Sequence, residues 1–102
     1  MEIKFILDVH LGRLAKYLRL CGFDTLFSAL YDDREIIDIA LREARVIVTR
    51  DRLLIKGARE AKGYLVKSQY HDEQLREVFE ELKLRDRVRL FSRCIACNSL
   101  LE

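Results

Sequence analysis

The chain of 102 residues has no proline, no tryptophan and only four glycines. A sandwich or barrel of many short strands needs frequent tight turns, so this composition argues against that class. The chain also has little excess charge, because 19 basic and 17 acidic residues leave a net charge of +2. That charge is too small for the whole molecule to attract a polyanion, and any such attraction must come from local clusters.

Cysteine is scarce as well, with three residues in the chain, two of them close together near the C-terminus. An odd and unevenly spaced set does not describe a secreted disulfide framework, and it fits a reducing cytosol. No apolar run approaches the roughly 20 residues that span a bilayer, and the N-terminus does not have the order of a signal peptide. We therefore expect a cytoplasmic protein without membrane contact.

The chain is rich in apolar and charged residues, at 50% and 35%, and its length and composition describe one globular domain. Short apolar runs alternate with amphipathic stripes. These patterns predict strands at 3–7, 23–27, 45–49 and 64–66, and helices at 11–21, 32–44, 53–61 and 71–82. We expect Gly22 and Gly63 to end the first and third helices. Alternating strands and helices imply a parallel sheet covered on both faces, which is a three-layer α/β class.

Three aspartates lie where predicted strands end or a predicted helix begins. Asp8 comes after the first strand, Asp33 opens the second helix, and Asp51 comes after the third strand. Since the carboxyl ends of parallel strands share one edge, where such sheets bind their ligands, we expect the three side chains to converge there. Clustered carboxylates repel one another unless a divalent cation lies between them, and oxygen-only ligands suit Mg²⁺ or Mn²⁺. Such ions activate water for attack on a phosphodiester, which makes these aspartates candidate catalytic and metal-binding residues.

Most of these acids also have a simpler explanation, which is helix capping. Asp32 or Asp33 can cap the second helix, and Asp51 can cap the third. Asp8 has no evident capping role in the sequence. Asp72 is a candidate fourth metal ligand, but it also fits the ordinary acidic first turn of a helix.

Basic side chains flank the predicted acids. The candidates for binding the phosphates of a nucleic acid are Arg13, Lys16, Arg19, Arg50 and Arg52. A solvated helix face carries similar charges, so the evidence lies in their position beside the acids rather than in the stripe alone. Four aromatic residues are candidates for stacking on unpaired bases: Tyr17, Phe27, Tyr31 and Tyr70.

Five segments, taken in order along the chain, resemble one family: residues 8–19, 32–40, 49–51, 73–75 and 93–98. The family is the Mut-seven C-terminal ribonuclease domain, a PIN-like group. The resemblance implies a PIN-like α/β/α domain over residues 1–90, with a central parallel sheet of about four strands, and Mg²⁺- or Mn²⁺-dependent cleavage of RNA. The acids of the family fall on Asp8, Asp33 and Asp51, with Asp72 at a less certain fourth position, and Arg13 matches a basic position in the same motifs, as does Arg50.

The C-terminal tail, residues 91–102, departs from the family pattern. The family usually continues from a first Cys-x-x-Cys pair into a zinc ribbon with a second pair, but only the pair Cys94 and Cys97 is present. Structural zinc takes four ligands, and Cys21 is the only other cysteine. The pair is first interpreted as a remnant or truncated half of a zinc ribbon, with a redox pair or a site completed by a second molecule as alternatives.

The sequence thus favours a metal-dependent endoribonuclease that acts on RNA. The alternative is a noncatalytic PIN-like module that binds RNA or a protein partner. A phosphatase or receiver domain also gathers aspartates at a sheet edge, but the phosphatase type needs a second aspartate two residues after the first, where this chain has His10. PIN-like domains often pair or act with an antitoxin, so the resemblance also implies a homodimer or an antitoxin-type inhibitor as candidate partners.

Overall fold

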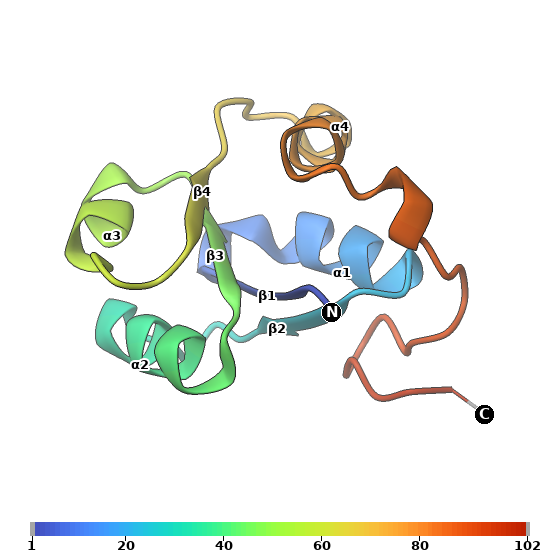
Figure 1. Cartoon of the computed structure of the whole chain (residues 1–102), viewed down its shortest axis with the longest axis horizontal. Helices are drawn as coiled ribbons and strands as arrows, with labels where there is room; N and C mark the ends of the chain where they lie inside the picture. The colour runs from blue at the N-terminus through green and yellow to red at the C-terminus, as the bar shows by residue number, and fades with distance from the viewer. Residues whose placement is uncertain (1, 102) are drawn as a thin grey trace.

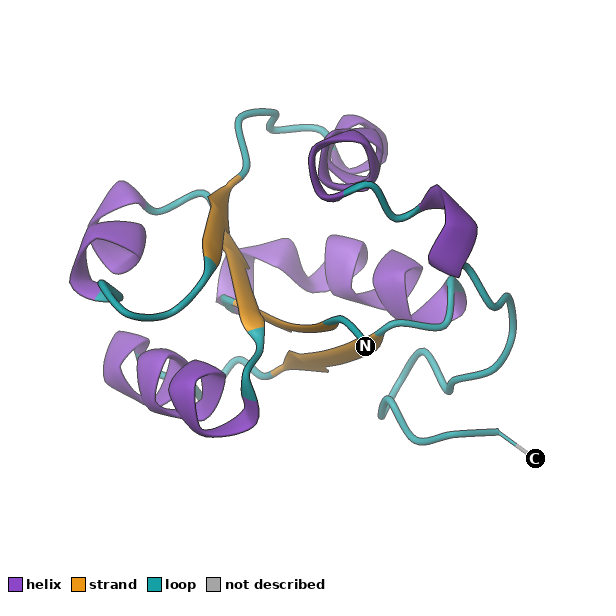
Figure 2. Cartoon of the chain, in the orientation of Figure 1, coloured by secondary structure: helices purple, strands orange, loops and turns teal. Residues whose placement is uncertain are grey.

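The computed structural model describes residues 2–101. In this part of the chain, four strands alternate with four α-helices (Figures 1 and 2). The strands are β1 (Lys4–Leu7), β2 (Asp24–Phe27), β3 (Val46–Thr49) and β4 (Gly63–Leu65). The helices are α1 (Gly12–Leu20), α2 (Asp33–Glu43), α3 (Arg52–Gly57) and α4 (His71–Leu82). Two short 3₁₀ turns lie at Val9–Leu11 and Arg85–Arg87.

The four strands form one parallel sheet in the order β2-β1-β3-β4. Strand β1 is central, with Phe5 opposite both Thr25 of β2 and Val46 of β3. Helices α1 and α4 cover one face, while α2 and α3 cover the other, as Figure 1 shows. The predicted α/β class, with its parallel sheet between two helical layers, is therefore confirmed.

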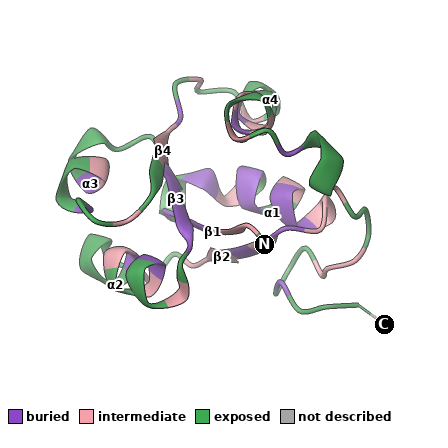
Figure 3. Cartoon of the chain, in the orientation of Figure 1, coloured by how far each residue is buried: buried purple, intermediate pink, exposed green. Residues whose placement is uncertain are grey.

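The core lies on both faces of the sheet because successive strand residues point to opposite sides. Phe5 and Leu7 pack with α1 and α4, whereas Ile6 packs with α2 and α3. Figure 3 shows the buried strands at the centre and the exposed outer faces of the helices. The packing on both faces holds the sheet in place and therefore also positions the carboxyl ends of its strands.

The third helix differs from the prediction. It was expected to continue to residue 61, but α3 ends at Gly57, and the chain then turns through Ala58. Gly63 begins β4 instead of ending a helix. A Cβ at this position would lie 2.6 Å from Cδ1 of Ile55, so the glycine permits close contact between β4 and α3. Gly22, by contrast, follows α1 as predicted, in a backbone conformation with φ of 95° that favours glycine.

None of the helices within residues 2–101 has the length and apolar character that crossing a bilayer requires. The boundary expected at residue 90 stays a prediction.

Candidate active site

The carboxylate of Asp8 lies at the carboxyl end of the central strand β1. It is only 7% exposed. One of its oxygens, Oδ1, accepts a hydrogen bond from the backbone N of His10 at 3.1 Å, and the other, Oδ2, accepts one from the hydroxyl of Thr49. Asp8 thus caps the 3₁₀ turn that follows it, a role that the sequence did not reveal. No lysine or arginine among residues 2–101 forms an ion pair with it, so this buried carboxylate has no cationic partner.

Thr49 joins two of the predicted acids. Its hydroxyl donates to Asp8 and also accepts a hydrogen bond from the backbone N of Asp51 at 3.0 Å. Thr49 was not predicted as a site residue. Its role depends on the register of the sheet, in which Leu7 lies opposite Val48, so that Asp8 and Thr49 follow at neighbouring strand ends. A single buried hydroxyl therefore fixes the ends of β1 and β3 relative to each other.

The carboxylate of Asp51 caps α3. Its Oδ1 accepts hydrogen bonds from the backbone N of Leu53 at 2.8 Å and of Leu54 at 3.4 Å, while the residue itself is exposed. The second helix is capped by Asp32, whose side chain and that of Glu35 form a reciprocal capping box. The capping roles considered for Asp32 and Asp51 are therefore confirmed.

Asp33 and Asp72 lie outside this arrangement. Asp33 is the first residue of α2 and Asp72 is in the first turn of α4; both are exposed, and no described residue binds either carboxylate. Within residues 2–101, no three histidine, cysteine, aspartate or glutamate side chains form a group that could hold a metal ion. The structure thus connects Asp8 with Asp51 and does not bring Asp33 or Asp72 to them. Metal binding by these four residues stays a prediction.

The oxygen donors at this edge match the ligand preference of a hard cation. Mg²⁺ is commonly held by one or two protein carboxylates, with water and substrate phosphates as its remaining ligands. Asp8 supplies a carboxylate after β1 and Asp51 one after β3, and the hydroxyl of Thr49 hydrogen-bonds to the carboxylate of Asp8 and to the backbone N of Asp51. Carboxylate and hydroxyl oxygens are the ligands that hard cations prefer. The donor set therefore fits a Mg²⁺ or Mn²⁺ ion shared with a phosphate, rather than a site enclosed by the protein.

Four of the five predicted phosphate-binding side chains are exposed. These are Arg13 and Lys16 on α1, Arg50 between β3 and α3, and Arg52 at the start of α3. In the part of the chain that the structure describes, none of the four is paired with a carboxylate. Their charges are thus available to an anion at the edge of the sheet where Asp8 and Asp51 lie.

Arg19 has a different environment. It was expected, with Arg13 and Lys16, to be a basic side chain available to a nucleic acid, but the residue is only 6% exposed. Its Nε donates to the backbone O of Thr25 at 2.8 Å, and its Nη1 donates to the backbone O of Ile95 at 3.0 Å and of Ala96 at 3.3 Å. Arg19 therefore fastens the C-terminal tail to the domain, and we leave it out of the proposed RNA contacts.

The two tail cysteines, Cys94 and Cys97, lie in the tight loop whose carbonyls at Ile95 and Ala96 accept hydrogen bonds from Arg19. The backbone N of Asn98 donates to the carbonyl of Cys94 at 2.8 Å, and Asn98 has a left-handed backbone with φ of 73°. The amide side chain of Asn98 accepts from the backbone N of Thr25 at 2.9 Å and donates to Asp24 at 2.7 Å. Cys21, which follows α1, is half-buried, and no third metal ligand joins Cys94 and Cys97 within the described chain. Zinc binding by this pair stays a prediction.

Two of the cysteines, Cys97 and Cys21, are expected to differ in reactivity. Hydrogen bonds from the hydroxyl and backbone of Ser99 are the main cause that lowers the pKa of the exposed Cys97 thiol, whereas burial raises the pKa of Cys21. Because the thiolate is the nucleophile, iodoacetamide at neutral pH should alkylate Cys97 well before Cys21. Mass spectrometry of a labelling time course measures this order, with Cys97→Ser as the control; faster labelling of Cys21 would contradict it.

Comparison with known proteins gives one match. The family model described as "Mut7-C RNAse domain" matches residues 3–102. No curated protein and no solved structure shows significant similarity to the chain. The match covers nearly every residue of the sequence, including the ends of β1 and β3 and the cysteine loop of the tail. The chain therefore belongs to the Mut7-C RNAse domain family.

Proposed function

We propose that this chain is an endoribonuclease that hydrolyses RNA phosphodiesters with the help of Mg²⁺ or Mn²⁺, and that Asp8 and Asp51 are its central acidic residues. Membership of a ribonuclease domain family supports the reaction class. The observation that carries the proposal is the carboxylate of Asp8, which is buried at the sheet edge and forms no ion pair with any lysine or arginine within residues 2–101.

A buried ionised group without a partner of opposite charge is costly, and proteins rarely keep one without a function. The two hydrogen bonds to Asp8 come from neutral groups, a backbone N–H and a hydroxyl. They orient the carboxylate, and no ion pair within the described residues accompanies them. A divalent cation that also binds a phosphate would supply a charge of opposite sign.

In this proposal Asp8 and Asp51 would hold the ion, with Asp33, which opens α2, as a further candidate ligand. When bound, the ion lowers the pKa of a water molecule that attacks the phosphorus and stabilises the charge of the leaving oxygen. Thr49 is a positioning residue. Its hydroxyl donates a hydrogen bond to the carboxylate of Asp8 and accepts one from the backbone N of Asp51. Arg13 and Arg50 bind the phosphates on either side of the reacting one.

The test is cleavage of a labelled single-stranded RNA by the purified chain. We expect fragments that arise from breaks inside the strand in the presence of Mn²⁺ or Mg²⁺, and none after chelation by EDTA. Restoring the ion after chelation should restore the activity. Intact RNA in the presence of either ion would contradict the proposal.

One observation favours the alternative of a noncatalytic RNA-binding module, namely that no group of three potential ligands exists among residues 2–101. That alternative predicts RNA binding that is independent of metal and is not followed by cleavage. The same assay separates the two functions, because binding and cleavage are measured on the same RNA.

A further inference from the structure

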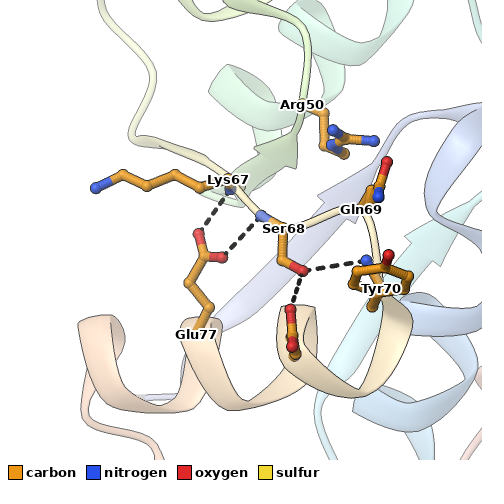
Figure 4. Close-up of a pocket in the computed structure, with 7 residues that line it drawn as sticks. Arg50, Lys67, Ser68, Gln69, Tyr70 and Glu77 are labelled. Carbon is orange, nitrogen blue, oxygen red and sulfur yellow. Dashed lines mark hydrogen bonds between the residues drawn. The ribbon is translucent and has the colours of Figure 1, made fainter.

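A shallow pocket of about 500 Å³ lies next to the proposed centre. Arg50, which follows β3, lines one side, and the loop of residues 67–70 between β4 and α4 lines another (Figure 4). The backbone N of Val66, just before this loop, donates to the carbonyl of Thr49 at 2.7 Å. The pocket and the Asp8–Thr49–Asp51 arrangement therefore share the end of β3.

The loop is held in place by α4. The carboxylate of Glu77 accepts hydrogen bonds from the backbone N of Lys67 at 2.8 Å and of Ser68 at 3.1 Å, and another from the hydroxyl of Tyr64. Burial raises the pKa of Glu77, but these hydrogen bonds outweigh that effect and hold the pKa below its usual range. Glu77 is thus a structural carboxylate that clamps the loop backbone, as the dashed lines in Figure 4 show.

A second set of hydrogen bonds fixes the turn that leads into α4. The hydroxyl of Ser68 donates to Glu73 at 2.7 Å and accepts from the backbone N of Tyr70 at 3.1 Å. The side chain of the buried Gln74 donates to the carbonyl of Ser68 at 3.0 Å. The loop conformation is therefore formed before any ligand arrives, which reduces the entropy cost of binding.

Three side chains at the pocket are left without a partner. Tyr70 is 58% exposed, and within residues 2–101 its hydroxyl forms no hydrogen bond and its ring pairs with no other aromatic ring. Gln69 and Arg50 are exposed as well, and no hydrogen bond or ion pair engages their side chains. Figure 4 shows these three side chains on the side of the loop away from Lys67.

Their chemistry matches one unpaired nucleotide. An exposed aromatic ring stacks on a base of any kind, an amide hydrogen-bonds to base edges, and a guanidinium binds a phosphate. Stacking on Tyr70 requires a base that has been freed from its neighbours, which a single strand offers and a duplex does not. Arg50 lines the pocket and immediately precedes Asp51 in the chain, so a phosphate bound to it would lie between the pocket and the proposed centre.

We propose that Arg50, Gln69 and Tyr70 form a subsite, here called the Tyr70 subsite, for one unpaired nucleotide of single-stranded RNA beside the bond to be cleaved. The base stacks on Tyr70, Gln69 contacts its edge, and the phosphate on the side of the acids binds Arg50. This proposal rests on the proposed function and adds to it a preference for single-stranded RNA.

Fluorescence anisotropy of a short labelled single-stranded RNA, in EDTA so that the strand stays intact, tests the subsite. Tyr70→Ala should weaken binding about tenfold, whereas Tyr70→Phe, which keeps the ring, should stay within about twofold of wild type. The matched control is Phe91→Ala, which removes another exposed aromatic ring, 72% exposed, from the tail. Circular dichroism melting checks that each variant is folded.

A scan of abasic nucleotides locates the contact. One position in the RNA should lose affinity for wild type when its base is removed, and Tyr70→Ala should abolish that loss, because the two changes delete the same contact. Equal affinity of wild type and Tyr70→Ala, or a loss as large for Phe91→Ala, would overturn the subsite but leave RNA cleavage untouched. Failure of wild type to bind or cleave any RNA would instead overturn the proposed function together with the subsite.

Discussion

Asp8→Asn is expected to lower the rate of RNA cleavage at least about 100-fold while the protein stays folded. The substitution removes the negative charge at the sheet edge and keeps the shape of the side chain. An asparagine can still accept a hydrogen bond from Thr49 or His10, so the free energy of unfolding should change by only about 1 kcal/mol. Initial cleavage rates in Mn²⁺, compared with melting curves of the same samples, measure the two effects separately.

The matched control is Asp38→Asn, which makes the same chemical change at an exposed position of α2. It should cleave RNA at the wild-type rate. A folded Asp8→Asn variant with wild-type activity would show that the buried carboxylate has only its capping role. Equal losses in both variants would point to the net charge of the protein rather than to the site.

Arg19→Ala should produce the other large effect, this time on stability. The guanidinium satisfies a carbonyl of β2 and two carbonyls of the tail, and the backbone O of Thr25 would be left buried without a donor. We expect a loss of about 2 to 3 kcal/mol in the free energy of unfolding, because an unsatisfied buried acceptor and the lost packing both contribute. For a domain of this size, the melting temperature should fall by about 10 °C or more.

Arg13→Ala is the control on the same helix. Arg13 is exposed and carries no structural hydrogen bond among residues 2–101, so its removal should leave the melting temperature nearly unchanged. It should weaken RNA binding instead, and reduce the slope of log affinity against log salt by about 0.7, the value for one contact to a single strand. If Arg19→Ala left stability intact and reduced that slope, Arg19 would be an RNA contact after all.

The sequence predicted the architecture well because local patterns determine it. Alternating apolar runs and amphipathic stripes indicated every strand and helix, and the parallel topology followed from their order. The error at α3 has a local cause that the pattern does not encode. Ala58 and Ala61 continue the apolar spacing of a helix, yet they lie in a turn, since the backbone must leave α3 to bring Gly63 beside Ile55.

The candidate site was predictable only in part. The position of Asp8 after an apolar strand was readable, but its partner Thr49 depends on the register between β1 and β3. Arg19 shared its helical spacing with exposed basic residues, and its actual acceptors at Ile95 and Ala96 lie 76 and 77 residues further along the chain. Such long-range contacts leave no local trace in a sequence, whereas the capping residue Asp32 was readable because its partner lies three residues away.

The central claim is that Asp8 binds a divalent cation, and Mn²⁺ binding measured by electron paramagnetic resonance tests it most directly. Titration of wild type should reveal bound Mn²⁺ that is released by excess Mg²⁺, because the two ions share oxygen ligands. Asp38→Asn should bind the ion equally well, while Asp8→Asn should lose it. Mn²⁺ binding that is the same in wild type and Asp8→Asn would contradict the account.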